Sequence, residues 1–306
     1  MTKNAMLDKD AEGLIMFEDI IGQSFIFAHN DEAWKLKRKG CAHAFYKDRL
    51  VLMNETLKEK TEAQFERWAK TATENGFCDI DMSTEFSEIL ARNIIHVSFG
   101  EDLSDEKMVL KVKGVDGVYK PQTLSVKQAI NVIIDQVCFS FYRNVQNPIN
   151  WFYLYLERVF SVSSETEVVR ANCTTARDWI KDYIAHRRAG TRKSSVKGDT
   201  DILTLMLGQP KVFSDDTIVD ELLGFFGAAT DTTHNSMKTI LTYFTKNGSS
   251  LAKVRDEFDG ILNAEISKEK DLQKLSFGKQ LKEIVTIDNC FDLEYLNMVI
   301  LEGLRF

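Results

Sequence analysis

The chain has 306 residues, of which 44% are apolar, enough to bury a substantial core in one or two domains. Its net charge of −7 argues against a general nucleic-acid role, and only three prolines and 16 glycines favour long helices over a sandwich or barrel. The five cysteines are widely spread and include no C-x-x-C pair, which fits a reducing compartment and argues against a disulfide framework or a zinc ribbon.

The N-terminal 30 residues read as a loose, partly apolar lead-in, with no recognisable targeting signal and no run long enough to span a bilayer. Asp31 is predicted to cap a first helix that ends near Gly40. That helix carries Trp34 and Arg38 four residues apart, on one face. An indole N–H beside a guanidinium makes a donor pair suited to a carboxylate. A surface Trp packed under an Arg stem explains the same spacing and, taken alone, is the better interpretation.

Apolar residues at three- and four-residue steps predict most of the remaining chain to be helical. The predicted helices cover residues 47–73, 81–99, 124–143, 164–188, 201–208, 249–263 and 293–306, with a further segment starting at Pro148. Residues 189–200 are predicted to be a linker, and residues 264–290 are predicted to be polar and irregular. No stretch shows convincing strict alternation, so the sequence predicts a mainly α chain with little sheet.

One long helix, at about 215–247, is predicted to be central and buried. Ser214 is its expected N-cap, acidic residues fill the first turn, and Asn247-Gly248 closes it. About 33 residues span roughly 50 Å, enough to cross a whole domain. The stripe that predicts its buried face consists of Ile218, Leu222, Phe225, Ala229, Ser236, Ile240 and Phe244.

A cluster of small and polar residues lies inside this apolar stripe, namely Gly224, Gly227, Ala228, Ala229, Thr230, Asp231, Thr232 and Thr233. Each interior Gly costs about 1 kcal/mol relative to Ala, and a buried, unpaired Asp231 would cost several kcal/mol more. Small residues let a flat group approach the backbone. A Thr232 hydroxyl turned back onto the Ala228 carbonyl would loosen the helix and open a notch that holds water and moves protons. An ordinary packed helix, with Asp231 reaching solvent or a buried Arg, remains open.

Two further patterns carry weaker signals. Glu302 and Arg305 are three residues apart on the last helix, which predicts an ion pair, either buried or a routine surface salt bridge. A basic run from Lys35 to Arg49 is typical of a solvated face or of a surface that docks an acidic partner. The five histidines show no metal-binding spacing, and no phosphate loop or nucleophile elbow is present.

The joint order of the motifs is more specific than any one of them. Trp34-x-x-x-Arg38 comes first, the segment from Ala228 to Thr233 follows on a long helix, and Glu302-x-x-Arg305 lies near the end. In this order they resemble the cytochrome P-450 family of haem-thiolate monooxygenases, of eukaryotic type. The Phe-Gly-Glu-Asp-Leu phrase at 99–103 and the Asn147-Pro148 pair agree with the resemblance. It implies a mainly α, partial cytochrome P-450 fold.

The resemblance also implies roles for single residues. Trp34 and Arg38 would lie on the helix that hydrogen-bonds a haem propionate. Ala228 and Ala229 would form the groove over the haem face. The family usually has Gly where Ala229 stands, and the extra methyl group is tolerable there.

The remaining implied roles concern protons and the stability of the core. Asp231 and Thr232 would be the acid–alcohol pair that binds water and delivers protons to dioxygen. Glu302 and Arg305 would be the buried pair that locks the proximal core. Where Gly303 stands the family usually has a small polar residue, so Gly is expected to weaken the helix slightly.

The chain resembles only part of such a protein. We expect residues 1–306 to be a single partial domain that lacks the family's N-terminal anchor and sheet region and its C-terminal haem-cysteine region. None of the five cysteines lies in a Phe- and Gly-rich loop, so we expect no metal ligand in this chain. The chain alone is therefore expected neither to bind haem stably nor to turn over, and its apolar surface is expected to be exposed.

For the intact enzyme the resemblance implies a haem cofactor and electrons from an NADPH-dependent reductase or another donor. One oxygen atom would enter a lipophilic small molecule, on the cytosolic face of the endoplasmic reticulum. No nucleic-acid partner and no transmembrane segment in this chain are expected. The alternative is a non-enzymatic helical interaction protein or a decayed copy that retains the scaffold, whereas a His-ligated haem carrier has little support.

Overall fold

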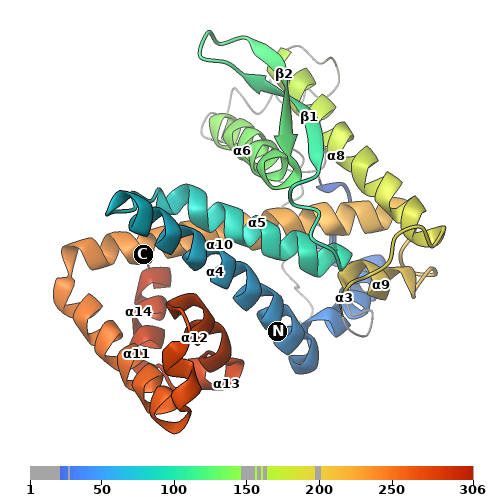
Figure 1. The fold of residues 1–306 in the computed structure, drawn as a ribbon. Helices are drawn as coiled ribbons and strands as arrows, with labels where there is room; N and C mark the ends of the chain where they lie inside the picture. Colours follow the sequence, from blue (N-terminus) through green and yellow to red (C-terminus); the bar gives the residue numbers. More distant parts are fainter. Residues whose placement is uncertain are drawn as a thin grey trace, which may run out of the picture. The chain divides into compact units, whose positions relative to one another are not determined.

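The computed structural model describes residues 21–26, 28–145, 156, 160, 164–196 and 201–305. The lead-in before residue 21, the segment that starts at Pro148 and the terminal Phe306 lie outside the described residues, and the predictions made for them stay predictions. Where the chain is described it is mainly α with one two-stranded sheet, as the sequence predicts (Figure 1). Across the described ranges, no helix combines the length and the apolar character that crossing a bilayer requires.

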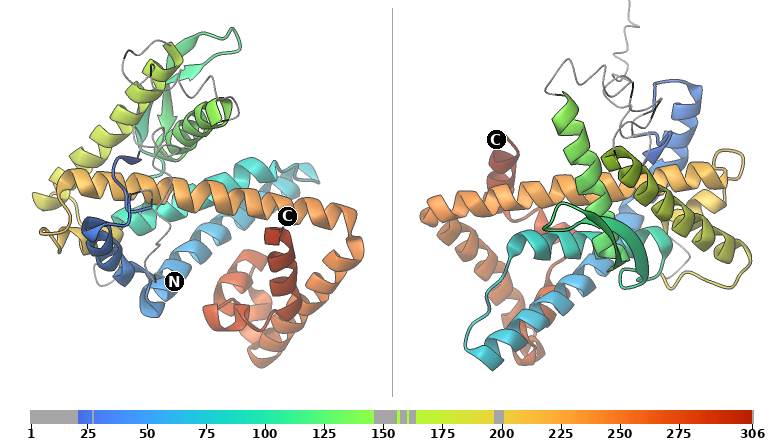
Figure 2. Two further views of the ribbon diagram at one scale, coloured as in Figure 1. Left: turned by 180° about the vertical axis from the view of Figure 1, so that it is seen from behind. Right: turned by 90° about the horizontal axis from the view of Figure 1, so that it is seen from above.

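The elements follow one another along the chain with short connections (Figures 1 and 2). The α-helices are α3 (Glu32–Ala42), α4 (Lys47–Asn75), α5 (Met82–Phe99), α6 (Val126–Val145), α8 (Ser164–Arg188), α9 (Ile202–Leu207), α10 (Asp215–Lys246), α11 (Gly248–Lys268), α12 (Phe277–Ile284), α13 (Ile287–Cys290) and α14 (Glu294–Arg305). Two 3₁₀ turns, η1 (His43–Phe45) and η2 (Lys270–Lys274), and strands β1 (Lys107–Lys113) and β2 (Tyr119–Ser125) complete the list.

Polar N-cap residues begin several of these helices where the sequence predicts them. The side chains of Asp31, Asp201 and Ser214 each accept the N–H three residues later, at 2.7, 2.8 and 3.2 Å. Asp81 accepts the Ser83 N–H at 3.0 Å. These bonds satisfy N–H groups that have no partner inside the helix, which is why short polar side chains mark helix starts reliably.

The long helix α10 ends within one residue of its predicted bounds, but it differs in two ways from the helix expected. It is continuous from Asp215 to Lys246, so the glycine and threonine cluster does not interrupt it. It is also buried only in its first half. Ile218 and Leu222 are fully buried, whereas Thr232 and Thr239 are exposed. The apolar stripe therefore predicts the core-facing side correctly but not how far along the helix the burial extends.

The β1–β2 hairpin is the element that the sequence reading missed. Its strands pair antiparallel, with Lys107 opposite Ser125 and Lys113 opposite Tyr119. Gly117 takes a φ of 77°, a conformation that suits Gly, and the Gly114 N–H donates to the Val118 carbonyl at 2.8 Å. An Asp-Gly pair between two strand-prone runs is a hairpin signal, and it lay unused at residues 116–117.

Residues 264–290 correct another prediction. The segment is polar, as its sequence shows, but it is largely helical, because α11 runs to Lys268 and η2, α12 and α13 follow. Thr286 and Asn289 explain the last of these, since each side chain accepts the other's backbone N–H in a capping box, at 3.1 and 2.8 Å. Short helices of one or two turns leave little periodicity to detect.

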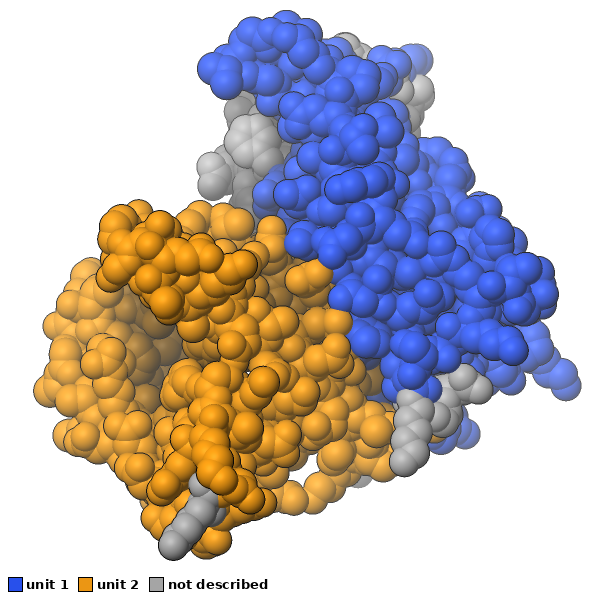
Figure 3. All heavy atoms as spheres, in the orientation of Figure 1, with its two compact units in different colours: residues 1–46, 94–229 blue, residues 47–93, 230–306 orange. Residues whose placement is uncertain are grey.

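The contacts divide the chain into two compact units (Figure 3). Unit 1 comprises residues 1–46 and 94–229, and unit 2 comprises residues 47–93 and 230–306. Both α5 and α10 contribute to each unit. This division does not test the prediction of a single partial domain over 1–306, which stays a prediction.

The core of unit 1 centres on Phe99, at the end of α5. Its ring meets Trp179 and Tyr183 of α8 edge-on, with centroids 5.3 and 4.7 Å away, and lies 5.9 Å from Phe226 of α10. Phe99, Tyr183 and Phe226 are almost completely buried. Such edge-to-face contacts add about 0.5–1.5 kcal/mol per pair to the burial of the rings, and they join α5, α8 and α10.

A buried polar cluster lies beside this core. The Arg187 guanidinium donates to the Phe99 carbonyl at 2.6 Å, pairs with Asp201 at 3.2 Å, and also donates to the Thr204 hydroxyl. Both charged side chains are nearly inaccessible to solvent. Asp201 meanwhile caps α9, so one ion pair fixes the end of α8 to the start of α9.

Unit 2 places α14 through its first turn. The Tyr295 and Leu296 N–H groups donate to the Glu257 carboxylate of α11, at 2.7 and 2.9 Å. A Cβ added at Gly303 would lie 2.6 Å from Cγ1 of Ile240 on α10. Gly303 therefore has a packing reason that the sequence reading, which expected only a weaker helix, did not foresee.

The outer side of α14 is apolar. Met298, Leu301 and Leu304 are all exposed, at three-residue spacing. This matches the expectation that the chain exposes apolar surface near its last helix.

Gly40 in α3 gives a direct test of close packing in unit 1. A Cβ there would lie 2.6 and 2.9 Å from ring atoms of the fully buried Phe213. We expect Gly40→Ala to lower the free energy of unfolding by about 1–2 kcal/mol, because overpacking outweighs the gain in helix propensity. Urea denaturation measures this. Gly260→Ala on α11 is the control, since its added Cβ meets open space, and it should raise stability by up to about 1 kcal/mol. A gain at both sites would contradict the packing at Phe213.

Candidate functional site

The predicted donor pair on α3 forms, but its two members do different things. The Arg38 guanidinium carbon lies 5.3 Å from the centre of the Trp34 ring, within cation–π range. The indole N–H points to the protein instead and donates to the Phe25 carbonyl at 2.9 Å. Arg38 is exposed and forms no ion pair within the part of the chain that the structure describes. Of the two predicted donors, only the guanidinium is therefore available to a carboxylate from outside.

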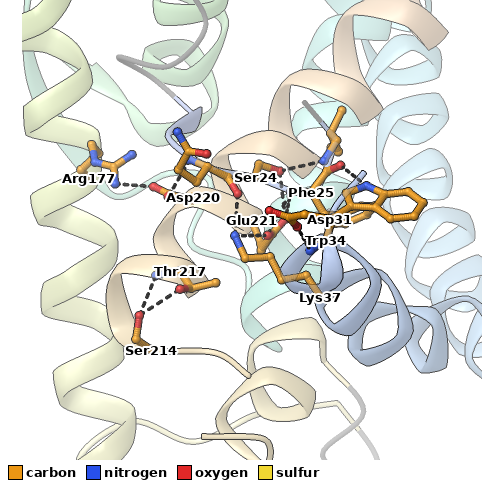
Figure 4. Close-up of polar contacts among 12 residues, drawn as sticks. Ser24, Phe25, Asp31, Trp34, Lys37, Arg177, Ser214, Thr217, Asp220 and Glu221 are labelled. Atoms are coloured by element: carbon orange, nitrogen blue, oxygen red, sulfur yellow. Dashed lines mark hydrogen bonds and ion pairs between the residues drawn. The ribbon is translucent and has the colours of Figure 1, made fainter. Parts of the chain in front are cut away.

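Phe25 belongs to a short segment bound between α3 and α10 (Figure 4). Its N–H donates to both oxygens of Glu221, at 3.0 Å each, and the Ser24 hydroxyl donates to the same carboxylate at 2.9 Å. The Lys37 ammonium lies 3.6 Å from Glu221 and donates to the Gln23 carbonyl at 2.6 Å. One buried carboxylate therefore organises the segment whose carbonyl holds the Trp34 indole.

The neighbouring Asp220 binds the same segment from its other end. It accepts the Gln23 N–H at 2.8 Å and pairs with Arg177 of α8 (Figure 4). A Cβ at Gly22 would lie 2.2 Å from the Asp220 carboxylate, and the Gly22 φ of 49° also favours glycine. Residues 22–25 are thus fixed to α10 by two adjacent acids, a feature that we call the Asp220–Glu221 clasp.

Burial sets the charge state within the clasp. Glu221 is fully buried, and this burial raises its pKa, although the Ser24 and Phe25 hydrogen bonds and the Lys37 charge act in the opposite direction. The sequence reading missed both acids. The available signal was an Asp-Glu pair inside an apolar run, between Val219 and Leu222, where unpaired charges would be costly.

The small residues of α10 separate into two groups by their surroundings. A Cβ at Gly224 would lie 2.4 Å from the Ser24 hydroxyl, so this glycine allows the close approach of the clasp. At Gly227, by contrast, an added Cβ would meet no atom within 4 Å. Ala228 is exposed and Ala229 is half-buried. The surface around Gly227 and Ala228 is therefore open and free of bulky side chains.

The predicted acid–alcohol pair follows directly on α10. Asp231 is half-buried and accepts a hydrogen bond from the Asn235 side chain, one turn on, at 3.0 Å. Thr232 is exposed, on the same side of the helix as Ala228. His234 lies nearby, 3.1 Å from the Ser83 hydroxyl of α5. Asp231 thus meets the solvent and an amide rather than a buried Arg.

Glu302 and Arg305 form the ion pair that their spacing predicts. Two parallel bonds of 2.8 and 2.7 Å join the guanidinium to the carboxylate. The pair raises the pKa of Arg305 and lowers that of Glu302 through this hydrogen bonding. Both side chains are exposed, so in this chain the pair has the geometry of a surface salt bridge.

The cysteines provide no evident thiolate. Burial, reinforced by the charge of Glu221, raises the pKa of Cys41 to about 12, and burial also raises that of Cys290. Both are therefore protonated thiols near neutral pH. No group of three or more His, Cys, Asp or Glu side chains among the described residues is arranged to hold a metal ion.

The comparisons with known proteins agree with this arrangement of helices. The sequence matches the family described as Cytochrome P450 over residues 10–306. The fold is similar to the crystal structure of a cytochrome P450, CYP102L1, with a TM-score of 0.66 at 18% sequence identity. This match covers 96% of the chain but 58% of the other protein, so the chain spans less than two thirds of that protein's length.

At 18% identity the structural likeness shows the fold alone, whereas the family match takes in nearly the whole sequence. The chain therefore belongs to the cytochrome P450 family.

Proposed function

We propose that this chain is the part of a haem-dependent monooxygenase that binds a haem propionate and supplies the distal proton path. The observation that carries the proposal is the open strip of α10, where Gly227, Ala228 and Thr232 leave the helix surface bare beside the half-buried Asp231. A flat group can approach such a strip closely, and a carboxylate with a hydroxyl can hold water there.

The residues present fit haem at two of the places that such a group needs. The exposed Arg38, whose guanidinium forms no ion pair among the described residues, would bind a propionate carboxylate. Ala228 and Ala229 would border the ring. Haem, when bound, supplies the oxygen chemistry with electrons from a reductase. The third need, a thiolate ligand, is not met by Cys41 or Cys290, whose raised pKa values keep them protonated.

Within this function the residues of the chain bind, orient and move protons. Arg38, held over the Trp34 ring, neutralises a carboxylate. Asp231, kept in place by Asn235, accepts a proton from water and passes it on, and the Thr232 hydroxyl orients that water. We further propose a lipophilic small-molecule substrate, an NADPH-dependent reductase or other electron donor, and the cytosolic face of the endoplasmic reticulum. That the chain alone does not hold haem stably stays a prediction.

One observation favours the alternative, a helical interaction protein that keeps the scaffold. The Trp34 indole N–H, which the family resemblance assigns to a propionate, is already bonded to the Phe25 carbonyl. Activity measurements decide between the two proposals.

The test uses Asp231→Asn and Thr232→Val in a form of the protein that carries a thiolate-ligand segment. We expect each to lower product formation about a hundredfold, the scale of a lost proton-transfer group, while NADPH consumption falls less. Product per NADPH consumed is the measurement. Thr239→Val is the matched control, because Thr239 is also exposed on α10 and bonded to the carbonyl four residues earlier. Equal coupling in all three variants would refute the proposed proton path.

A further inference from the structure

The β1–β2 hairpin differs from the rest of the chain in its charge. Residues 107–125 contain four lysines and one aspartate, a net charge of +3. The whole chain carries −7, which leaves −10 for the remaining residues. A short element of opposite sign on an acidic protein concentrates a positive field at one place on the surface.

The lysines of β1 lie together on the outer face of the hairpin. The strand alternates, with Met108 and Leu110 buried and Lys107, Lys111 and Lys113 exposed. None of these three lysines forms an ion pair within the described part of the chain. The outer face is therefore positively charged and not neutralised by the protein itself.

The single acid of the hairpin does not cancel this charge. Asp116 pairs with Lys120, and that hydrogen bond lowers the pKa of Asp116, so the two charges balance each other. Beside the hairpin, Glu165 of α8 accepts a hydrogen bond from the Tyr119 hydroxyl at 3.1 Å. The three β1 lysines remain as the net charge.

The tip of the hairpin is apolar. Val115 is fully exposed, Val118 is half-exposed, and Val109 is exposed among the lysines of the outer face. Scattered exposed valines are ordinary on protein surfaces, but three in a seven-residue-per-strand hairpin form a contiguous group. Apolar tip and basic flank occur here in one element.

The hairpin is held firmly enough to present this surface. The Asn172 side chain of α8 accepts the Lys111 N–H and donates to the Lys111 carbonyl, at 2.9 Å each, and it also bonds Gln136 of α6. Asn172 is almost completely buried. Figures 1 and 2 show β1 alongside α6 and α8, with the turn at 114–118 extending beyond them.

We propose that the outer face and tip of the β1–β2 hairpin dock on an anionic lipid surface. Val115 and Val118 enter the boundary between headgroups and acyl chains, and Lys107, Lys111 and Lys113 reach the lipid phosphates. An acidic protein would complement the lysines but would leave the fully exposed Val115 unexplained. The proposal stands on the charge and exposure of the hairpin and does not depend on the oxygenase activity proposed above.

Vesicle binding by the 306-residue chain tests the proposal. The probes are vesicles of phosphatidylcholine with about 30% phosphatidylserine, compared with pure phosphatidylcholine. Because each lysine near such a surface changes the partition coefficient about fivefold, we expect the triple variant Lys107→Gln, Lys111→Gln, Lys113→Gln to bind at least tenfold less. Co-sedimentation at two salt concentrations measures this, and wild-type binding should weaken at the higher salt.

A matched triple variant controls for net charge. Lys70, Lys268 and Lys274 are exposed lysines in unit 2, beside Glu74, Glu265 and Asp271, and changing all three to Gln removes the same charge. This variant should bind like wild type. Equal loss in both triples, or equal binding to both vesicle types, would overturn the proposal.

The tip is tested separately. Val115→Ser with Val118→Ser should lower binding about tenfold while the salt dependence stays. Val115→Trp should give emission that brominated acyl chains quench beyond the wild-type level. Absent quenching, or binding of the chain to polyglutamate and not to vesicles, would assign this face to an acidic protein instead of a membrane.

Discussion

Replacing Glu221 by Leu should lower the free energy of unfolding by about 3–5 kcal/mol, the usual cost of leaving buried polar partners uncompensated. Glu221 is fully buried and accepts hydrogen bonds from the Ser24 hydroxyl and the Phe25 N–H, with the Lys37 ammonium 3.6 Å away. Leu fills the space but accepts none of these bonds. The measurement is urea denaturation followed by circular dichroism at neutral pH.

Glu221→Gln is the matched control, because its amide oxygen still accepts one of the donors. It should cost clearly less than Glu221→Leu. The two substitutions also differ from wild type in pH dependence. Burial raises the pKa of Glu221, so its protonated form is favoured in the folded state, and the stability it contributes is lost as pH rises through that pKa.

The stability difference between wild type and Glu221→Gln should therefore move in favour of wild type as pH falls from 7 towards the ordinary Glu value of 4.5. Leu and Gln variants of equal stability, or a pH dependence of opposite sign, would contradict the clasp.

A loss at Glu221 should also reach α3. Phe25 gives its N–H to Glu221 and its carbonyl to the Trp34 indole, so the same residue connects both. The sequence reading assigned Trp34 to an outside carboxylate and did not consider that a backbone carbonyl nine residues earlier would take its N–H. The spacing of Trp34 and Arg38 determines which face they share, but only the folded lead-in determines which partner each finds.

Local signals in the sequence account for most of the helices. Asp31, Asp201 and Ser214 mark helix starts because the capping bond involves only residues close along the chain. The long reach of α10 follows from an uninterrupted 3.6-residue pattern. The hairpin escaped because its strands are short and half-exposed, and because the Asp116-Gly117 turn signal was not used.

Long-range partners could not be predicted in the same way. Asp220 and Glu221 meet residues almost 200 positions earlier in the sequence, and a carboxylate in an apolar run does not name its donor. The small residues of α10 show the same limit. Gly224 exists for the close approach of Ser24, whereas Gly227 faces open space, and the two look alike in the sequence.

The second large effect is expected at Arg187. Arg187→Met should cost about 3–5 kcal/mol, because it leaves the completely buried Asp201 without its cation and the Phe99 carbonyl without its donor. Met matches much of the aliphatic length, so packing changes little. Arg188→Met is the control at the adjacent position. Its partner Asp215 is half-exposed, and such pairs contribute about 0–1 kcal/mol.

A double-mutant cycle distinguishes a lost ion pair from lost packing. Asp201→Asn keeps the N-cap of α9 but removes the negative charge, so it should recover part of the loss when combined with Arg187→Met. The stability of the double variant should therefore exceed that of Arg187→Met alone. If the two changes add without interaction, the contribution of Arg187 lies in its bonds to Phe99 and Thr204 rather than in its charge. Because these bonds join α5, α8 and α9, either result identifies what holds the helices of unit 1 together.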